Sequence, residues 1–301
     1  MTHLGAGLNH LDMEYGVREP DHLGAVRLAD GRRLGWAQWG PADGTPVLFF
    51  GGAATSRSLG FGADALDRLG VRLLAVDRPG LGASDPDPAR TLSTWPQDIA
   101  QLVADLELAE TRIVGFSQGA PFALACAAAG IVQAVAIVSG QDDLTQPSFT
   151  DHLDPHLGGL LQAIAADPAG VEATFVSTAN AEMLWQLITA YSSGIDLAVY
   201  TSDNFQPAFR RALAEGFVQG AAGYVRDLVL TMQPWPFTVE EITAPVDLWY
   251  GAHDTSTVHS PDFGETLARR LPNARRWLLP DAGGSLLWTH AEEILTSLLA
   301  R

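Results

Sequence analysis

The pentapeptide Gly115-Phe116-Ser117-Gln118-Gly119 is the part of this sequence whose residue types and spacing point most directly to chemistry. An apolar run, Arg112–Phe116, precedes the serine, and an alanine-rich helical segment, Ala120–Ala129, follows it. A serine in a tight strand-to-helix turn needs glycine two positions away on either side, because larger side chains would collide with it or with neighbouring strands. Such a turn raises the hydroxyl and places the backbone N–H of Gln118 beneath a developing oxyanion. The pattern predicts that Ser117 is a nucleophile.

Strand and helix patterns alternate along the chain, and their order predicts how this serine is positioned. Asp30-Gly31 favours a tight hairpin within Val26–Trp39. Runs typical of buried strands occupy residues 46–50, 71–76 and 112–116, and further strands are expected at residues 132–139, 246–250 and 274–279. Helical spacing is found in residues 58–69, 95–108, 120–129, 263–271 and 285–299. The alternation predicts an α/β fold with a parallel sheet and right-handed crossovers.

The segment from Asp142 to about Ile242 departs from this alternation. It has helical periodicity and loops but no convincing strand pattern. We therefore expect a helical cap over residues 141–243, inserted into a core formed by residues 1–140 and 244–301. Large apolar residues are frequent between Phe149 and Phe237, so the cap is expected to roof an apolar pocket above Ser117 and to admit a hydrophobic small molecule.

On these residues the chain resembles the α/β-hydrolase superfamily in its capped, single-domain form, and the likeness covers nearly everything from Val26 onward. The resemblance implies a mostly parallel eight-stranded sheet flanked by helices, with the cap after the sixth strand. It implies that the backbone N–H of Ala53 is a second oxyanion donor, in a Gly51-Gly52-Ala53 loop where many members carry His-Gly. Asp77–Ser84 resembles the structural D-x-x-G-x-G-x-S loop of the family.

The resemblance also assigns an acid and a base. Asp254 stands at the usual acid position, with Asp142 or Asp143 at a second position known in the family. The base is expected after the last strand, but Gly284 stands at the histidine position. His290 lies six residues further along a predicted helix, in register with apolar neighbours, and so points elsewhere. Other histidines that could replace the base lie near Asp254 or in the cap: His253, His259, His152 and His156.

Without its base, a serine hydroxyl is a weak nucleophile, and loss of the histidine costs about a million-fold in turnover. We therefore expect an inactivated or divergent hydrolase of a hydrophobic ester, lactone or related acyl compound. A second reading is a non-hydrolytic enzyme, such as a cyclase, isomerase or lyase, that uses the same pocket. A third is a ligand-binding pseudoenzyme.

The composition of the chain argues against several classes of binding partner. A net charge of −17 disfavours nucleic acid and anionic lipid as partners, and no run is long and apolar enough to cross a membrane. Met1–His22 lacks the apolar segment of a signal peptide, and the single Cys126 excludes an internal disulfide. A cytoplasmic protein is expected. No histidine pair has metal-site spacing, so neither metal nor cofactor is expected; a homodimer is left open.

Overall fold

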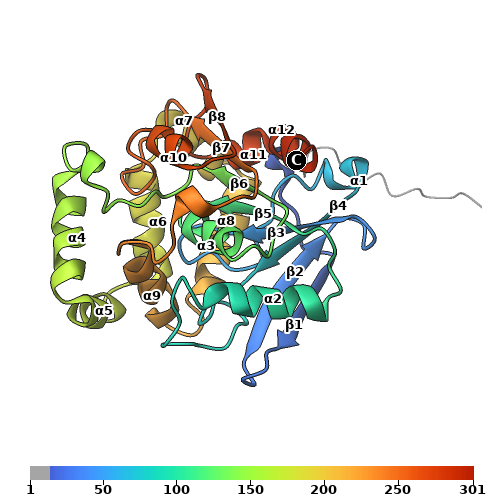
Figure 1. Cartoon of the computed structure of the whole chain (residues 1–301), viewed down its shortest axis with the longest axis horizontal. Coiled ribbons are helices and arrows are strands. Elements are labelled where there is room, and N and C mark those ends of the chain that lie inside the picture. The colour runs from blue at the N-terminus through green and yellow to red at the C-terminus, as the bar shows by residue number, and fades with distance from the viewer. Residues whose placement is uncertain (1–13) are drawn as a thin grey trace, which may run out of the picture.

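The computed structural model describes residues 14–301, and within them one eight-stranded sheet forms the centre of the molecule (Figure 1). Residues 1–13 lie outside the described residues. They include the first part of the predicted core and most of the Met1–His22 segment that is predicted to lack a signal peptide. The strand order is β1-β2-β4-β3-β5-β6-β7-β8, and β2 is antiparallel to both of its neighbours, whereas β3 to β8 are parallel. The predicted α/β-hydrolase fold with a mostly parallel sheet is confirmed.

Among the eight strands, β3 to β7 follow the apolar runs of the sequence closely, whereas β1 begins four residues before the hairpin predicted from Val26 and β8 has no fully buried residue. Their bounds are β1 His22–Arg27, β2 Arg33–Trp39, β3 Thr45–Phe50, β4 Val71–Val76, β5 Arg112–Phe116, β6 Ala134–Val138, β7 Val246–Gly251 and β8 Ala274–Leu279. Every residue of β6 and β7 is buried, as expected for parallel strands that are covered by helices on both faces. The helices of the core are α1 Leu66–Leu69, α2 Trp95–Asp105, α3 Gly119–Ala128, α10 Glu265–Arg270, α11 Leu286–Thr289 and α12 Ala291–Leu299.

Between β6 and β7 the chain forms a series of helices, and no strand occurs among these described residues. We call this segment the cap; its α-helices are α4 Pro155–Ala166, α5 Pro168–Val176, α6 Ala181–Ala190, α7 Gly194–Tyr200, α8 Phe205–Gly216 and α9 Ala222–Thr231. Figure 1 shows α4 and α5 at one end of the molecule, furthest from the sheet. Aromatic residues of α7 and α8 pack with Trp288 of α11, and Phe205 has its ring centre 4.8 Å from that of Trp288. The cap and the core therefore share one apolar cluster.

Two predicted helices differ from the structure. Residues 58–69 form only the short α1, because Gly60 packs against the Trp39 ring and Gly62 has φ +63°, outside the helical region. Residues 285–299 divide into α11 and α12 at His290, which has φ −130°. The predicted helical register of His290 is therefore wrong, and its Nδ1 lies 2.9 Å from Thr289 Oγ1.

Candidate active site

Ser117 occupies a sharp turn between β5 and α3. Its φ of +51° lies in the left-handed region that non-glycine residues rarely adopt, a conformation that costs about 1–3 kcal/mol and clusters at functional sites. A Cβ at Gly115 would lie 2.8 Å from Ala123 Cβ, and one at Gly119 would lie 2.0 Å from the carbonyl oxygen of Phe50. Both glycines are therefore required by the close approach of helix and strand to this turn.

His259 lies directly beside this serine. Its Nε2 is 2.8 Å from Ser117 Oγ, and its Nδ1 is 2.7 Å from Asp254 Oδ2. The side chains of His259 and Asp254 are only 8% and 4% exposed. Since an ionised carboxylate only accepts hydrogen bonds, Nδ1 carries the proton and Nε2 is left to accept from the serine hydroxyl. The expectation that the serine lacks an imidazole partner is wrong.

The loop between β7 and α10 brings His259 to this position. Asp254 Oδ1 accepts a hydrogen bond from the backbone N–H of Ser256 at 3.0 Å, which starts a turn. Ser260 then donates its backbone N–H to the Gly140 carbonyl at 2.9 Å and its hydroxyl to Asp142 Oδ2 at 3.0 Å. Acid and base therefore stand five positions apart on one loop, which crosses the end of β6.

The second acid position holds a structural carboxylate. Asp142 is fully buried, and besides Ser260 it accepts from the backbone N–H of Asp143 at 2.8 Å. Burial raises the pKa of Asp142 to about 6. Asp143 accepts from Thr145 and Gln146. Of the acidic positions considered from the sequence, only Asp254 contacts the histidine.

Gly284, at the position where the catalytic histidine was expected, packs against the carboxylate of Asp254. A Cβ at this position would be 2.8 Å from Asp254 Oδ1 and 3.0 Å from its Cγ. The backbone N–H groups of Gly284 and Ser285 donate to the carboxylate of Asp196 in α7, at 3.0 and 2.7 Å. Two carboxylates, one from the core and one from the cap, thus converge on this glycine. Asp196, only 2% exposed, was not identified from the sequence.

The two predicted oxyanion donors flank the serine. A Cβ on Gly52 would lie 3.5 Å from Ser117 Cβ, so the loop that carries Ala53 approaches the nucleophile closely. Within residues 14–301 no hydrogen bond occupies the backbone N–H of Ala53 or that of Gln118. Both residues line the pocket above Ser117. Both N–H groups are thus unengaged within the described residues, and their role as oxyanion donors stays a prediction.

A cavity of about 310 Å³ opens above this site, and most of its lining residues are apolar, many of them from the cap. They include Phe175, Leu184, Ile188, Phe209, Tyr224 and Met232. No lysine or arginine occurs among the described residues that line the cavity, whereas Asp154, Asp196 and Asp254 do. The described lining therefore offers an anionic ligand no permanently charged cationic side chain.

The other histidines considered as the base, and the cysteine, make no described contact with Ser117. His253 and His152 are exposed, and His156 lines the cavity. Cys126 is buried, which raises the pKa of its thiol far above the usual value and fits the predicted packing role. No group of three metal-ligating side chains occurs in the described part of the chain. None of the helices described is long and apolar enough to span a membrane.

Residues 45–291 match the family model described as alpha/beta hydrolase fold. A non-heme chloroperoxidase of Streptomyces lividans is 34% identical over 105 residues, which cover 32% of this chain and 36% of that protein. The chain thus spans about a third of the length of this curated relative. Among solved structures, the enol-lactonase from Burkholderia xenovorans LB400 is 18% identical, with a TM-score of 0.68 and coverage of 92% and 98% of the two chains. An esterase from Exiguobacterium antarcticum is 16% identical, with a TM-score of 0.65 and coverage of 92% and 97%.

Proposed function

Because the chain belongs to the α/β-hydrolase fold family, we propose that it is a serine hydrolase that cleaves an ester or lactone bond in an uncharged, largely apolar small molecule. The observation that carries this proposal is the 2.8 Å contact between His259 Nε2 and Ser117 Oγ, with Asp254 2.7 Å from the other ring nitrogen. This arrangement has the roles and order of contacts of a serine–histidine–acid triad.

In the proposed reaction, Ser117 Oγ attacks the substrate carbonyl carbon while its proton passes to His259 Nε2. Asp254 stabilises the imidazolium that forms, through the bond to Nδ1–H. The backbone N–H groups of Ala53 and Gln118 bind the oxyanion. His259 then returns the proton to the leaving alkoxide, and the C–O bond breaks to leave an acyl-enzyme. Water, deprotonated by the same imidazole, releases the acid and restores the serine.

The substrate class follows from the cavity and the charge of the chain. The lining is mostly apolar, it carries three acidic side chains but no lysine or arginine among the described residues, and the chain has a net charge of −17. An anionic substrate would meet repulsion both at a distance and at the site. Esterase and enol-lactonase are names of structural neighbours whose fold this chain shares, and both reactions break an acyl–oxygen bond.

The test is hydrolysis of p-nitrophenyl esters of acetate, butyrate and octanoate by the natural chain and by His259→Gln. We expect the substitution to lower kcat by about 10⁴-fold or more, because the serine loses its base. His253→Gln is the matched control, since this histidine is next to the acid but exposed, and its kcat should stay within about twofold. In His259→Ala, added imidazole should restore part of the rate.

Labelling with a fluorophosphonate separates the competing functions. We expect the fluorophosphonate to modify Ser117 covalently in the natural chain, and we expect no such labelling in His259→Gln. If the natural chain is neither labelled nor active on any of these esters, the ligand-binding reading replaces the proposal. Labelling without ester turnover would favour the non-hydrolytic enzyme. Equal turnover in His259→Gln and His253→Gln would refute the assigned base.

A further inference from the structure

Arg78 is a fully buried guanidinium that joins three parts of the candidate site. It follows β4 in the D-x-x-G-x-G-x-S segment, and its side chain is 1% exposed. Nη1 donates to the carbonyl of Gly51 at 2.7 Å and Nη2 to the carbonyl of Gly52 at 2.9 Å. Nε donates to Asp227 Oδ2 in α9 at 2.7 Å. Nη2 also lies 3.4 Å from Oε1 of Gln118, the residue after the nucleophile.

The bond to Gly52 matters because of peptide geometry. The carbonyl of Gly52 and the N–H of Ala53 belong to one peptide unit, and in a trans peptide these two groups point in opposite directions. Described residues contain no cis peptide bond. Holding the Gly52 carbonyl toward Arg78 therefore fixes the direction of the Ala53 N–H. Thr55 also donates to this carbonyl, from its hydroxyl at 3.0 Å, but Thr55 belongs to the same loop and moves with it.

The loop needs such a restraint because it is built from glycine. Gly51 and Gly52 have no Cβ to limit rotation of the peptide between them and their neighbours. A side chain at Gly51 would meet the Thr55 hydroxyl at 2.6 Å, so the loop cannot carry its own brace at that position. Hydrogen bonds from a charged donor are about twice as strong as those between neutral groups, and here one planar guanidinium supplies two of them to adjacent carbonyls.

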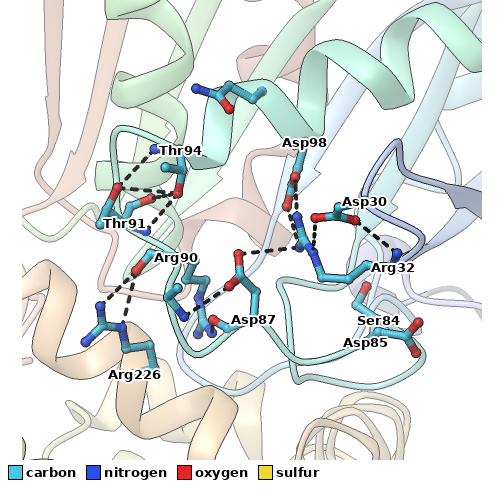
Figure 2. Close-up of polar contacts among 12 residues, drawn as sticks. Asp30, Arg32, Ser84, Asp85, Asp87, Arg90, Thr91, Thr94, Asp98 and Arg226 are labelled. Atoms are coloured by element: carbon cyan, nitrogen blue, oxygen red, sulfur yellow. Dashed lines mark hydrogen bonds and ion pairs between the residues drawn. The ribbon is translucent and has the colours of Figure 1, made fainter.

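Asp227 connects this restraint to the cap. Its carboxylate is fully buried and accepts from Arg78 on one oxygen and from Arg90 Nη2, at 2.5 Å, on the other. Arg90 donates in addition to Gly223 O at 2.6 Å, also in the cap, but to neither carbonyl of the Gly51-Gly52 loop. Figure 2 shows Arg226 of α9 reaching the main chain of Arg90, whose carbonyl it contacts at 2.9 Å. Arg78 and Arg90 are thus both almost completely buried and both bind the carboxylate of Asp227. Only Arg78 also donates to the carbonyl groups of the Gly51-Gly52 loop.

We propose that Arg78 is a positioning residue that holds the Gly52–Ala53 peptide with its N–H toward Ser117. The inference rests on the proposed hydrolase function for its kinetic consequence. It assigns a role to a buried charge that neither contacts the substrate cavity nor belongs to the triad.

The test compares Arg78→Gln with Arg90→Gln. Both variants remove one buried partner of Asp227, so both should lower the urea midpoint of unfolding to a similar extent. Only Arg78→Gln should lower kcat, by about 10- to 100-fold with KM within twofold, since loss of an oxyanion donor costs about 10²–10³ in kcat. Affinity for an alkyl trifluoromethyl ketone, which forms a tetrahedral adduct with the serine, should fall by the same factor. Equal kcat in the two variants, or a loss confined to KM, would overturn the proposal.

Arg78→Lys covers the case in which Arg78→Gln does not fold. The ammonium keeps a positive charge beside Asp227 but cannot act as a planar fork toward two carbonyls. The urea midpoint should lie close to that of the natural chain, with kcat still lowered at least about fivefold; full kcat would refute the role of the paired bonds.

A crystal structure of whichever variant folds gives a readout that does not depend on hydrolysis. We expect the Gly52 carbonyl to leave its position, and an unchanged Gly52–Ala53 peptide would refute the inference. If instead the natural chain shows no esterase activity while the peptide does rotate in the variant, the proposed function fails and the positioning role stands.

Discussion

Replacing Gly284 by alanine is expected to slow catalysis without closing the substrate cavity. The added Cβ would lie 2.8 Å from Asp254 Oδ1, whereas ordinary contacts begin at 3.4 Å, so the carboxylate must retreat by about 0.6 Å. Oδ2 of the same carboxylate is 2.7 Å from His259 Nδ1. If the carboxylate moves directly away from His259, this retreat lengthens the bond to about 3.3 Å, beyond the favourable range for a hydrogen bond.

The bond at risk joins a carboxylate to an imidazolium in the transition state, and such bonds contribute about 1.5–3 kcal/mol. At 1.36 kcal/mol for each factor of ten, the expected loss in kcat is about 10- to 100-fold. KM for p-nitrophenyl butyrate should stay within about threefold. The downfield proton resonance of the His259 Nδ1–H should shift upfield as the bond lengthens. Histidine at position 284 should be at least as damaging as alanine, because it also brings a Cβ to this point.

Gly159→Ala is the matched control. This glycine lies in α4, is exposed, and a Cβ there would meet nothing within 4 Å. It should leave kcat and the downfield resonance unchanged. If Gly284→Ala also keeps full kcat, either the carboxylate has not been displaced or its bond to the histidine does not support turnover. Either result refutes the predicted effect of a Cβ at position 284. A gain of activity in Gly284→His would show that the natural base is absent after all.

Two further predictions concern buried carboxylates. Because the pKa of Asp142 is raised from 3.8 to about 6 in the folded protein, the folded state binds more protons than the unfolded state between pH 4 and 6, and stability falls as pH rises through that window. Asp142→Asn should remove up to about 3 kcal/mol of this loss. In urea unfolding, the free energy of unfolding of the variant should therefore rise relative to that of the natural chain between pH 4.5 and 7. A difference in that free energy that stays constant with pH would contradict the raised pKa. Asp196→Ala leaves the buried N–H groups of Gly284 and Ser285 unpaired, so it should lower the free energy of unfolding by about 2–4 kcal/mol. It should also raise KM, because α7 is held less firmly against the core. If both quantities are unchanged, Asp196 does not stabilise the contact between cap and core.

Local patterns in the sequence were sufficient to predict most of the sheet and the strand-to-helix turn that carries Ser117. The turn at Ser117 depends on glycines two residues away and on the strand and helix that adjoin it, so its requirements are written within a few positions. The strands β3, β4 and β5 lie within one residue of their predicted bounds, because burial on both faces demands unbroken apolar runs. The edge strand β8 also matches its predicted bounds, although none of its residues is fully buried. The same local rules did not foresee the break at Gly60 and Gly62, since the first of these glycines is required by contact with distant Trp39.

The base of the candidate triad was decided by tertiary structure. The loop that carries His259 has no periodicity to read, and its path depends on bonds from Ser260 to Gly140 and Asp142, about 120 residues earlier. The contact between His259 and Ser117 joins positions 142 residues apart. The sequence alone therefore predicts a serine nucleophile and an acid. Only the folded loop shows that the imidazole reaches the serine from the acid's own loop, and that Gly284 leaves room for the acid.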